Sequence, residues 1–174
     1  VLDTSTVGAS VAEDTVKNAI TAVVVAVVFV MLYIMYAFRS VPNSYKYAFA
    51  AIVALTHDVV IVLGVFAVLG LAINAEVNAI FIVGILTVIG YSVNDTIVIF
   101  DRIRENVNLA PGREFRSTVN LSINESVTRS LGTSITTMTV ILAMLLFGGA
   151  SLRDFLIVLL AGVMIGTYSS IFIA

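Results

Sequence analysis

Five long apolar runs dominate this sequence of 174 residues, and each is long enough to cross a lipid bilayer as a helix. A spanning helix needs about 20 consecutive, mostly apolar residues. The runs cover residues 19–38, 47–70, 77–100, 127–147 and 155–174. They are continuous and lack the alternation typical of strands in an outer-membrane barrel. The sequence therefore predicts an all-α membrane protein, a bundle of five transmembrane helices.

The composition agrees with a membrane protein and argues against several other classes. Only 11% of the residues are charged and 60% are hydrophobic, whereas about 25% are charged in a typical soluble domain. A net charge of -2 argues against a basic surface that would bind a nucleic acid. There is no phosphate-binding loop, zinc-peptidase motif or nucleophile elbow. We expect membrane lipid as a partner, no nucleic acid, no cofactor or metal, and no enzymatic activity.

The polar segments between the runs predict the orientation in the membrane. Residues 39–46 and 101–126 together carry six of the nine lysines and arginines. Cytoplasmic loops are enriched in these cations, so we expect both segments in the cytoplasm, the N-terminal end outside and the C-terminal end inside. For the cytoplasmic loop 101–126 we expect a solvated connector, and an interfacial helix at its beginning is the alternative.

Residues 1–16 are polar and precede the transmembrane domain, which we place at residues 17–174. They are either a remnant of an external domain, such as its last strand, with a lead-in to the first span, or a frayed terminus. The sequence begins at Val1, and its first apolar run has no basic segment before it of the kind that marks a signal peptide. We therefore interpret the chain as a fragment of a longer protein.

Two ionisable residues within the apolar runs are the strongest functional signal. Asp95 lies in the third run and Arg129 in the fourth. An unpaired charge at the bilayer centre costs about 2.5–3.5 kcal/mol on insertion scales, so such residues normally face protein or water and have a partner. The two runs are consecutive and antiparallel, and both residues lie in the cytoplasmic half. We therefore expect Asp95 and Arg129 to face each other.

Each of these two runs also carries a stripe of small or polar residues at helical spacing, in line with its charge. The stripes are Gly84, Thr87, Tyr91 and Asp95 on one run, and Arg129, Thr133, Thr136, Thr137 and Val140 on the other. Residues three and four apart share one face of a helix, and polar faces within a membrane pack against each other, a partner helix or water. We predict a polar seam that supports the charged pair, made of Asn94, Tyr91, Thr133 and Thr136 with Asp58 and His57 of the second run.

Two interpretations of the Asp95–Arg129 pair stay open. It is either a static buried ion pair that holds helices together or a proton relay. Burial favours the neutral form of a carboxyl group and an adjacent guanidinium favours the carboxylate, so changing surroundings could load and release a proton. Arginine stays charged, which makes Asp95 the carrier and Arg129 its electrostatic partner.

Two further signals are weaker. His57 and Asp58 lie near the middle of the second run, where histidine suits a proton relay because it titrates near neutral pH. Alternatively, Asp58 only hydrogen-bonds a neighbouring helix and His57 is a satisfied core residue. Gly162 and Gly166 form a GxxxG step, which permits close helix packing but also recurs by chance in apolar segments.

Several stretches resemble the SecF proteins of the SecD/SecF family, which belong to the resistance–nodulation–division superfamily. The resemblance covers nearly the whole chain from Val7 onward. The matching stretches are ALTHDVVIVLG (54–64), VIGYSVNDTIVIFDRIREN (88–106), NLSINESVTRSLGTSITT (120–137), FGGASL (147–152) and GVMIGTYSSIFIA (162–174).

The resemblance implies that the five spans are helices two to six of a six-helix half of the resistance–nodulation–division fold. The first helix and most of the periplasmic domain would then lie outside this chain. It further implies a bacterial inner-membrane protein that pairs with SecD, joins the SecYEG channel and uses the proton gradient to move secreted polypeptides outward. Asp95 and Arg129 match the positions that the family implicates in proton conduction.

Two other functions remain as alternatives at this point. One is half of a proton-driven small-molecule efflux transporter of the same superfamily, and the other is a non-conducting scaffold subunit. Drug-susceptibility testing would separate the first from an export subunit. Replacing Asp95 and Arg129 together by apolar residues would separate the second, because a scaffold should tolerate that change.

Overall fold

The computed structural model describes the chain except for residues 1–3, 40, 42 and 74–78. The described part forms five long α-helices: α1 (Thr4–Ala37), α2 (Ser44–Ile73), α3 (Ala79–Leu109), α4 (Phe115–Phe147) and α5 (Arg153–Phe172), with the short 3-10 turn η1 (Ala150–Leu152) before α5. All five are long and apolar enough to cross a membrane. The predicted all-α bundle of five transmembrane helices is therefore confirmed, although the beginning of the third predicted span, at residues 77–78, lies outside the described residues.

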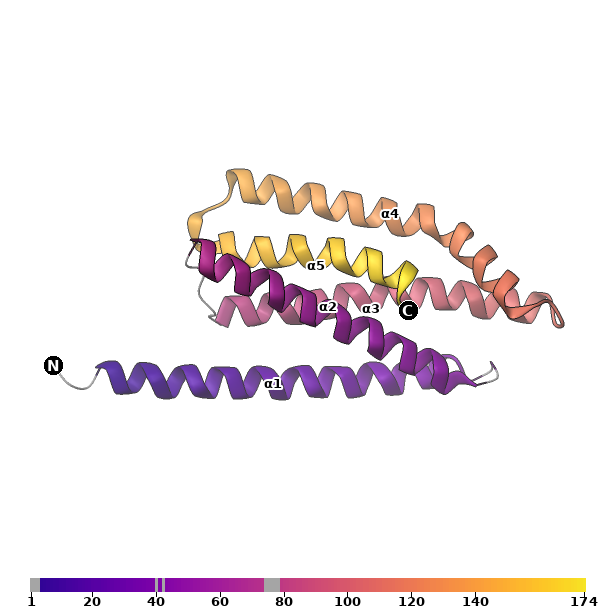
Figure 1. Cartoon of the computed structure of the whole chain (residues 1–174), viewed down its shortest axis with the longest axis horizontal. Helices are drawn as coiled ribbons and strands as arrows, with labels where there is room; N and C mark the ends of the chain where they lie inside the picture. The colour runs from indigo at the N-terminus through magenta and orange to yellow at the C-terminus, as the bar shows by residue number, and fades with distance from the viewer. Residues whose placement is uncertain (1–3, 40, 42, 74–78) are drawn as a thin grey trace.

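Successive helices run in opposite directions, so α1, α3 and α5 point one way and α2 and α4 the other (Figure 1). Helices α3 and α5 are the most buried of the five, and α1 is the least buried. Helix α5 lies between α4 on one side and α2 and α3 on the other (Figure 1), and it packs against all three. A side chain on α3 or α5 can therefore meet polar groups from several helices at once.

Glycines allow α3 and α5 to approach closely along parallel axes. A Cβ atom added to Gly162 of α5 would lie 2.1 Å from Cγ2 of Val88 on α3, and one added to Gly166 would lie 3.2 Å from Cβ of Ser92. On α3, a Cβ added to Gly84 would lie 3.1 Å from Cγ1 of Val158. Small residues at such spacing let helix backbones come together in membranes. The GxxxG step of α5 thus lies in a helix contact.

The helices are longer than the apolar runs at their polar ends. Helix α3 continues to Leu109 and α4 begins at Phe115, so most of the predicted connector 101–126 is helical and only a short turn separates the two helices. The beginning of this segment is therefore helical, as the alternative predicted, and many of its side chains are exposed. Together α3 and α4 extend beyond the end of α5 (Figure 1). The strand alternative for the N-terminal segment is also wrong for residues 4–16, which belong to α1.

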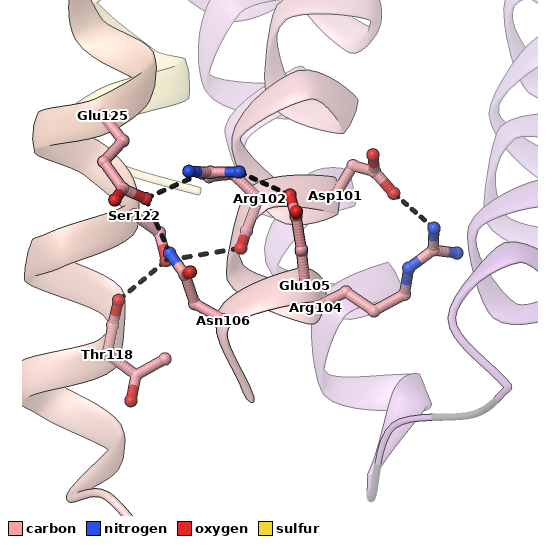
Figure 2. Close-up of polar contacts among 8 residues, drawn as sticks. All are labelled: Asp101, Arg102, Arg104, Glu105, Asn106, Thr118, Ser122 and Glu125. Carbon is pink, nitrogen blue, oxygen red and sulfur yellow. Dashed lines mark hydrogen bonds and ion pairs between the residues drawn. The ribbon is translucent and has the colours of Figure 1, made fainter. Parts of the chain in front are cut away.

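Polar contacts stabilise this two-helix extension. Nε of Arg102 on α3 donates to Oε2 of Glu125 on α4 at 2.7 Å, and Nη1 of Arg102 contacts Oε2 of Glu105 at 2.5 Å. Nδ2 of Asn106 donates to Glu125 at 2.8 Å and to Oγ of Ser122 at 2.9 Å (Figure 2). These contacts join α3 to α4 beyond the apolar runs, where Ile103 and Val107 of α3 and Val119 of α4 also pack into a hydrophobic cluster.

The same end of the bundle is anchored to α1 and α2. Phe38, Tyr47 and Phe100 form an aromatic cluster with ring centroids 5.4–6.0 Å apart. Nη1 of Arg104 donates to the backbone carbonyl of Ala37 at 2.9 Å, at the end of α1, where a cation is favoured by the helix dipole. The register of α1 and α2 against α3 is therefore defined by side chains next to the apolar spans.

Candidate functional site

Asp95 lies where three helices meet. Its side chain projects from α3 and is 5% exposed. The hydroxyl of Ser130 on α4 donates to Oδ1 at 2.6 Å, and the hydroxyl of Ser170 on α5 donates to Oδ2 at 2.5 Å. Both carboxylate oxygens thus have a donor from a different helix, and Asp95 links the three helices through hydroxyl groups.

Arg129 does not take part in this arrangement. Its side chain is exposed on α4, and among the described residues no ion pair or side-chain hydrogen bond of its guanidinium is found. The next residue, Ser130, points inward, because consecutive residues of an α-helix are about 100° apart. The expected contact between Asp95 and Arg129 is therefore wrong for this chain, and Ser130 is the group on α4 that Asp95 contacts.

The buried face of α4 differs from the predicted one for the same reason. Its buried positions recur every fourth residue, at Thr118, Ser122, Ser126, Ser130 and Ser134. Thr133 and Thr136 are exposed, and their hydroxyls donate to carbonyl groups of α4 itself, such as the contact from Thr133 to the carbonyl of Ser130 at 2.9 Å. The stripe that contains Arg129, Thr133 and Thr136 thus faces away from the bundle.

Tyr91 belongs to the seam, and Asn94 does not. The hydroxyl of Tyr91 donates to Oγ of Ser134 at 3.0 Å, and Ser134 in turn lies 2.6 Å from Oγ1 of Thr167 on α5. Thr167 donates to the carbonyl of Val163 at 2.7 Å, which sets the direction of the chain of hydrogen bonds. Asn94 is exposed on α3. A second polar layer therefore joins α3, α4 and α5 one turn away from Asp95.

Asp58 forms a second buried carboxyl centre. It lies on α2 and is 1% exposed. Its Oδ2 accepts hydrogen bonds from Ser92 on α3 and from Ser169 on α5, the latter at 2.6 Å. Its Oδ1 lies 3.0 Å from Nδ1 of His57, whose side chain is 28% exposed. Asp58 thus hydrogen-bonds neighbouring helices, which both alternatives for this residue allow, and His57 is a further partner.

The serines were missed as site residues by sequence reasoning. Ser92, Ser130, Ser169 and Ser170 supply hydroxyl contacts to the two aspartates, yet none of them was among the predicted seam residues. Two signals were available. The residues at 118, 122, 126, 130 and 134 form a small polar stripe with a spacing of four, and Ser169-Ser170 follows the GxxxG step by one turn. The charged stripe on the adjacent face of α4 is the stronger signal in the sequence, because charges in membranes usually face inward.

Hydroxyl groups allow these carboxyl groups to be neutral or charged. Among the described residues no lysine or arginine side chain is buried, so neither aspartate has a buried cation beside it. A serine hydroxyl both donates and accepts, so it can donate to a carboxylate or accept from a protonated carboxyl group. No buried side-chain polar atom is left unsatisfied in the part of the chain that the structure describes. This arrangement suits groups that bind and release a proton.

The described residues contain no group of three or more histidine, cysteine, aspartate or glutamate side chains able to hold a metal ion. Serine hydroxyls of neighbouring helices contact both aspartates, and His57 also contacts Asp58.

A family model matches this whole chain, from residue 1 to residue 174, and its description is "Protein export membrane protein SecD/SecF, C-terminal". The chain belongs to the SecD/SecF family. This confirms the resemblance recognised in the sequence.

Individual SecF and SecDF proteins agree with the family model. The chain is 43% identical to the protein translocase subunit SecF of Thermobaculum terrenum over 97% of its own length and 53% of that protein. It is 41% identical to the protein translocase subunit SecDF of Thermus thermophilus, covering 99% of the chain and 22% of that protein. The chain thus spans about half the length of the SecF relatives it matches.

The fold of a solved SecDF structure is shared as well. A crystal structure of SecDF in a super-membrane-facing form matches with a TM-score of 0.80 and 41% sequence identity, over 90% of this chain and 20% of that one. The five helices of this multi-pass membrane protein therefore have the arrangement of the corresponding part of SecDF.

Proposed function

We propose that this chain is part of a SecF-type subunit of the Sec protein-export machinery and couples proton movement across the membrane to the translocation of secreted polypeptides. The proposal is supported by membership of the SecD/SecF family. The observation that carries the coupling step is the buried carboxyl group of Asp95, which accepts hydrogen bonds from hydroxyl groups of two other helices. The energy source of the proposed export step would be the proton gradient, with no cofactor.

Protonation of Asp95 would change how α3, α4 and α5 hold each other. In the charged state both carboxylate oxygens accept from serines, whereas a protonated carboxyl group must itself donate. One serine then has to turn its hydroxyl to another acceptor, which weakens one link between helices. A charge that crosses the full membrane gains about 2.3 kcal/mol per 100 mV. This is comparable with one hydrogen bond to a charged group, at about 1.5–3 kcal/mol, so the gradient is sufficient to drive such a change.

SecD is the partner we propose for the exposed polar stripe of α4. Arg129, Thr133 and Thr136 lie within an apolar span but face away from the bundle. Contact of an arginine with lipid is expensive, so a second protein surface is favoured there. The relative from Thermus thermophilus is named SecDF, a name that combines SecD and SecF. Arg129 would then take part in proton movement at the interface between the two subunits.

The remaining assignments follow from the family. We place the protein in the bacterial inner membrane, with the extension of α3 and α4 in the cytoplasm, the N-terminal end outside and the C-terminal end inside, because this extension is rich in arginine. The SecYEG channel and the secreted polypeptide would be its further partners.

The test of the proposal is the substitution Asp95→Asn in the full-length protein. Asparagine keeps the shape of the side chain but cannot exchange a proton, so we expect membrane insertion to be normal and proton-dependent export to be abolished. Export of a secreted reporter would be measured in inverted membrane vesicles with and without a proton gradient. Asp101→Asn is the matched control, because Asp101 is exposed and pairs only with Arg104 on the surface.

Gradient-dependent export that is unchanged by Asp95→Asn, with expression confirmed, would remove Asp95 from the mechanism. A scaffold subunit would also tolerate the joint replacement of Asp95 and Arg129 by apolar residues. Altered drug susceptibility with normal export would instead favour a small-molecule efflux transporter.

A further inference from the structure

Asp58 is a buried ionisable group with its own set of partners, and the coupling step described for Asp95 does not use it. Its carboxyl group is 1% exposed and bonds to hydroxyls of two other helices, Ser92 and Ser169. A single neutral hydrogen bond between helices could be made by any short polar side chain. A carboxyl group is costlier to bury than a neutral polar side chain, and the neighbouring His57, 3.0 Å away, is a cation only when protonated. This points to a role beyond packing.

The two carboxyl groups are joined through adjacent residues of α5. Ser169 donates to Asp58 at 2.6 Å and Ser170 donates to Asp95 at 2.5 Å. On α3, Ser92 contacts Asp58 and lies one turn before Asp95 on the same helix. Any rotation of α5 that weakens one of these contacts therefore changes the other.

Each of the two serines on α5 has a second acceptor within reach. The hydroxyl of Ser169 lies 3.2 Å from the carbonyl oxygen of Gly166, and that of Ser170 lies 3.1 Å from the carbonyl oxygen of Thr167. When a carboxylate takes up a proton, the new carboxyl O–H donates to the serine oxygen. The serine hydroxyl then donates to the carbonyl of its own helix, so every polar group stays paired.

From this geometry we infer that Asp58 is a second proton-binding site, coupled to Asp95 through the hydroxyl groups of Ser169 and Ser170. This inference rests on the proposed function and deepens it, because it assigns two carboxyl groups in place of one. Two carboxyl groups that interact strongly titrate as a pair and not independently. Proton uptake at one site would thus influence the occupancy of the other.

The groups around Asp58 define how it would exchange its proton. Asp58 contacts His57 on its own helix, Ser92 on α3 and Ser169 on α5. Asp95 lies beyond Ser92 on α3. Helix α1 supplies valines to the core around Leu55 and Val62, one turn on either side of Asp58. None of the buried polar side chains that the structure describes comes from α1. His57, the partly exposed member of the group, is the route by which a proton would enter or leave.

The experiment is a pH titration of the assembled full-length complex in lipid nanodiscs by infrared difference spectroscopy. Protonated carboxyl groups give a carbonyl stretching band, and subtracting the spectrum of Asp58→Asn or Asp95→Asn from that of the wild type isolates each band. We expect Asp58→Asn to remove one band and to change the pH dependence of the band of Asp95. The control Asp101→Asn should leave the pH dependence of both bands unchanged.

Two results would overturn the inference. One is the absence of any difference band for Asp58 at every pH tested, which would mean that Asp58 never takes up a proton. The other is an Asp95 titration in Asp58→Asn that superimposes on the wild type, which would mean that the sites are uncoupled. The variant Ser169→Ala retains both aspartates and should change the pH dependence of the Asp58 band, so the test survives if Asp58→Asn folds poorly.

The spectroscopy separates this inference from the proposed function. Failure of Asp95→Asn to affect export would remove Asp95 from the proposed coupling mechanism but leave the two bands and their coupling unchanged. Conversely, a missing Asp58 band together with loss of export in Asp95→Asn would overturn only the second site.

Discussion

The contact between Gly162 of α5 and Val88 of α3 is the tightest glycine contact between the helices of the bundle, and the substitution Gly162→Ala tests it directly. The added Cβ would lie 2.1, 2.5 and 2.8 Å from Cγ2, Cγ1 and Cβ of Val88, whereas ordinary contacts begin at 3.4 Å. Because Cβ of Val88 is itself too close, rotating the valine cannot relieve the clash. The two helices must separate to admit the added methyl group.

The expected cost follows from two opposing effects. Forcing an extra methyl group into a well-packed contact costs about 1–3 kcal/mol. Replacing a glycine inside a helix by alanine stabilises the helix by about 0.5–1 kcal/mol. We therefore expect Gly162→Ala to lower the free energy of unfolding by up to about 2.5 kcal/mol. Separating α3 from α5 would also lengthen the contact between Ser170 and Asp95.

Reversible unfolding of the purified protein in mixed micelles, followed by circular dichroism, would measure this change. The control is Gly64→Ala on α2, where the added Cβ meets nothing within 4 Å, so its stability should stay equal or rise slightly. Gly166→Ala should fall between the two, because its Cβ would lie 3.2 Å from Ser92. Equal stabilities of the Gly162→Ala and Gly64→Ala variants would refute the close approach of α3 and α5.

Two further predictions concern the two faces of α4. Ser130→Ala removes the donor to Oδ1 of Asp95 and should lower the free energy of unfolding by about 1–3 kcal/mol in the same micelle assay, whereas Thr136→Ala should change it by less than about 0.5 kcal/mol. Thr136→Cys should cross-link to SecD in intact membranes with higher yield than Leu63→Cys on the exposed apolar surface of α2, because Thr136 lies on the stripe that we assign to SecD. The sequence has no cysteine of its own to interfere. Equal yields would contradict the assignment of this face to SecD.

The spans were predictable because membrane thickness limits the length of an apolar helix. The ends of α3 and α4 were not predictable in the same way. Beyond Phe100 the sequence is mostly polar, with apolar residues such as Ile103 and Val107 that pack in the hydrophobic cluster. Polar contacts of Arg102 and Asn106 with Glu125 join the two helices there. Apolar periodicity contains no information on such contacts.

The aspartates of the site were found from the sequence, and their partners were not. Asp95 and Asp58 are conspicuous because ionisable groups are rare in apolar runs. Helix α4, however, carries a stripe with Arg129 and Thr133 and another with Ser126, Ser130 and Ser134. Spacing alone shows that each stripe occupies one face, and it does not show which face turns inward.

By itself, the sequence determined that this chain enters a membrane as five helices and that carboxyl groups lie within them, since the exclusion of water from lipid constrains both length and charge. Only the tertiary structure decided which groups meet those carboxyls. The rotation of each helix about its own axis depends on how side chains of all the neighbouring helices fit together, as Gly162 against Val88 and Ser130 against Asp95 demonstrate.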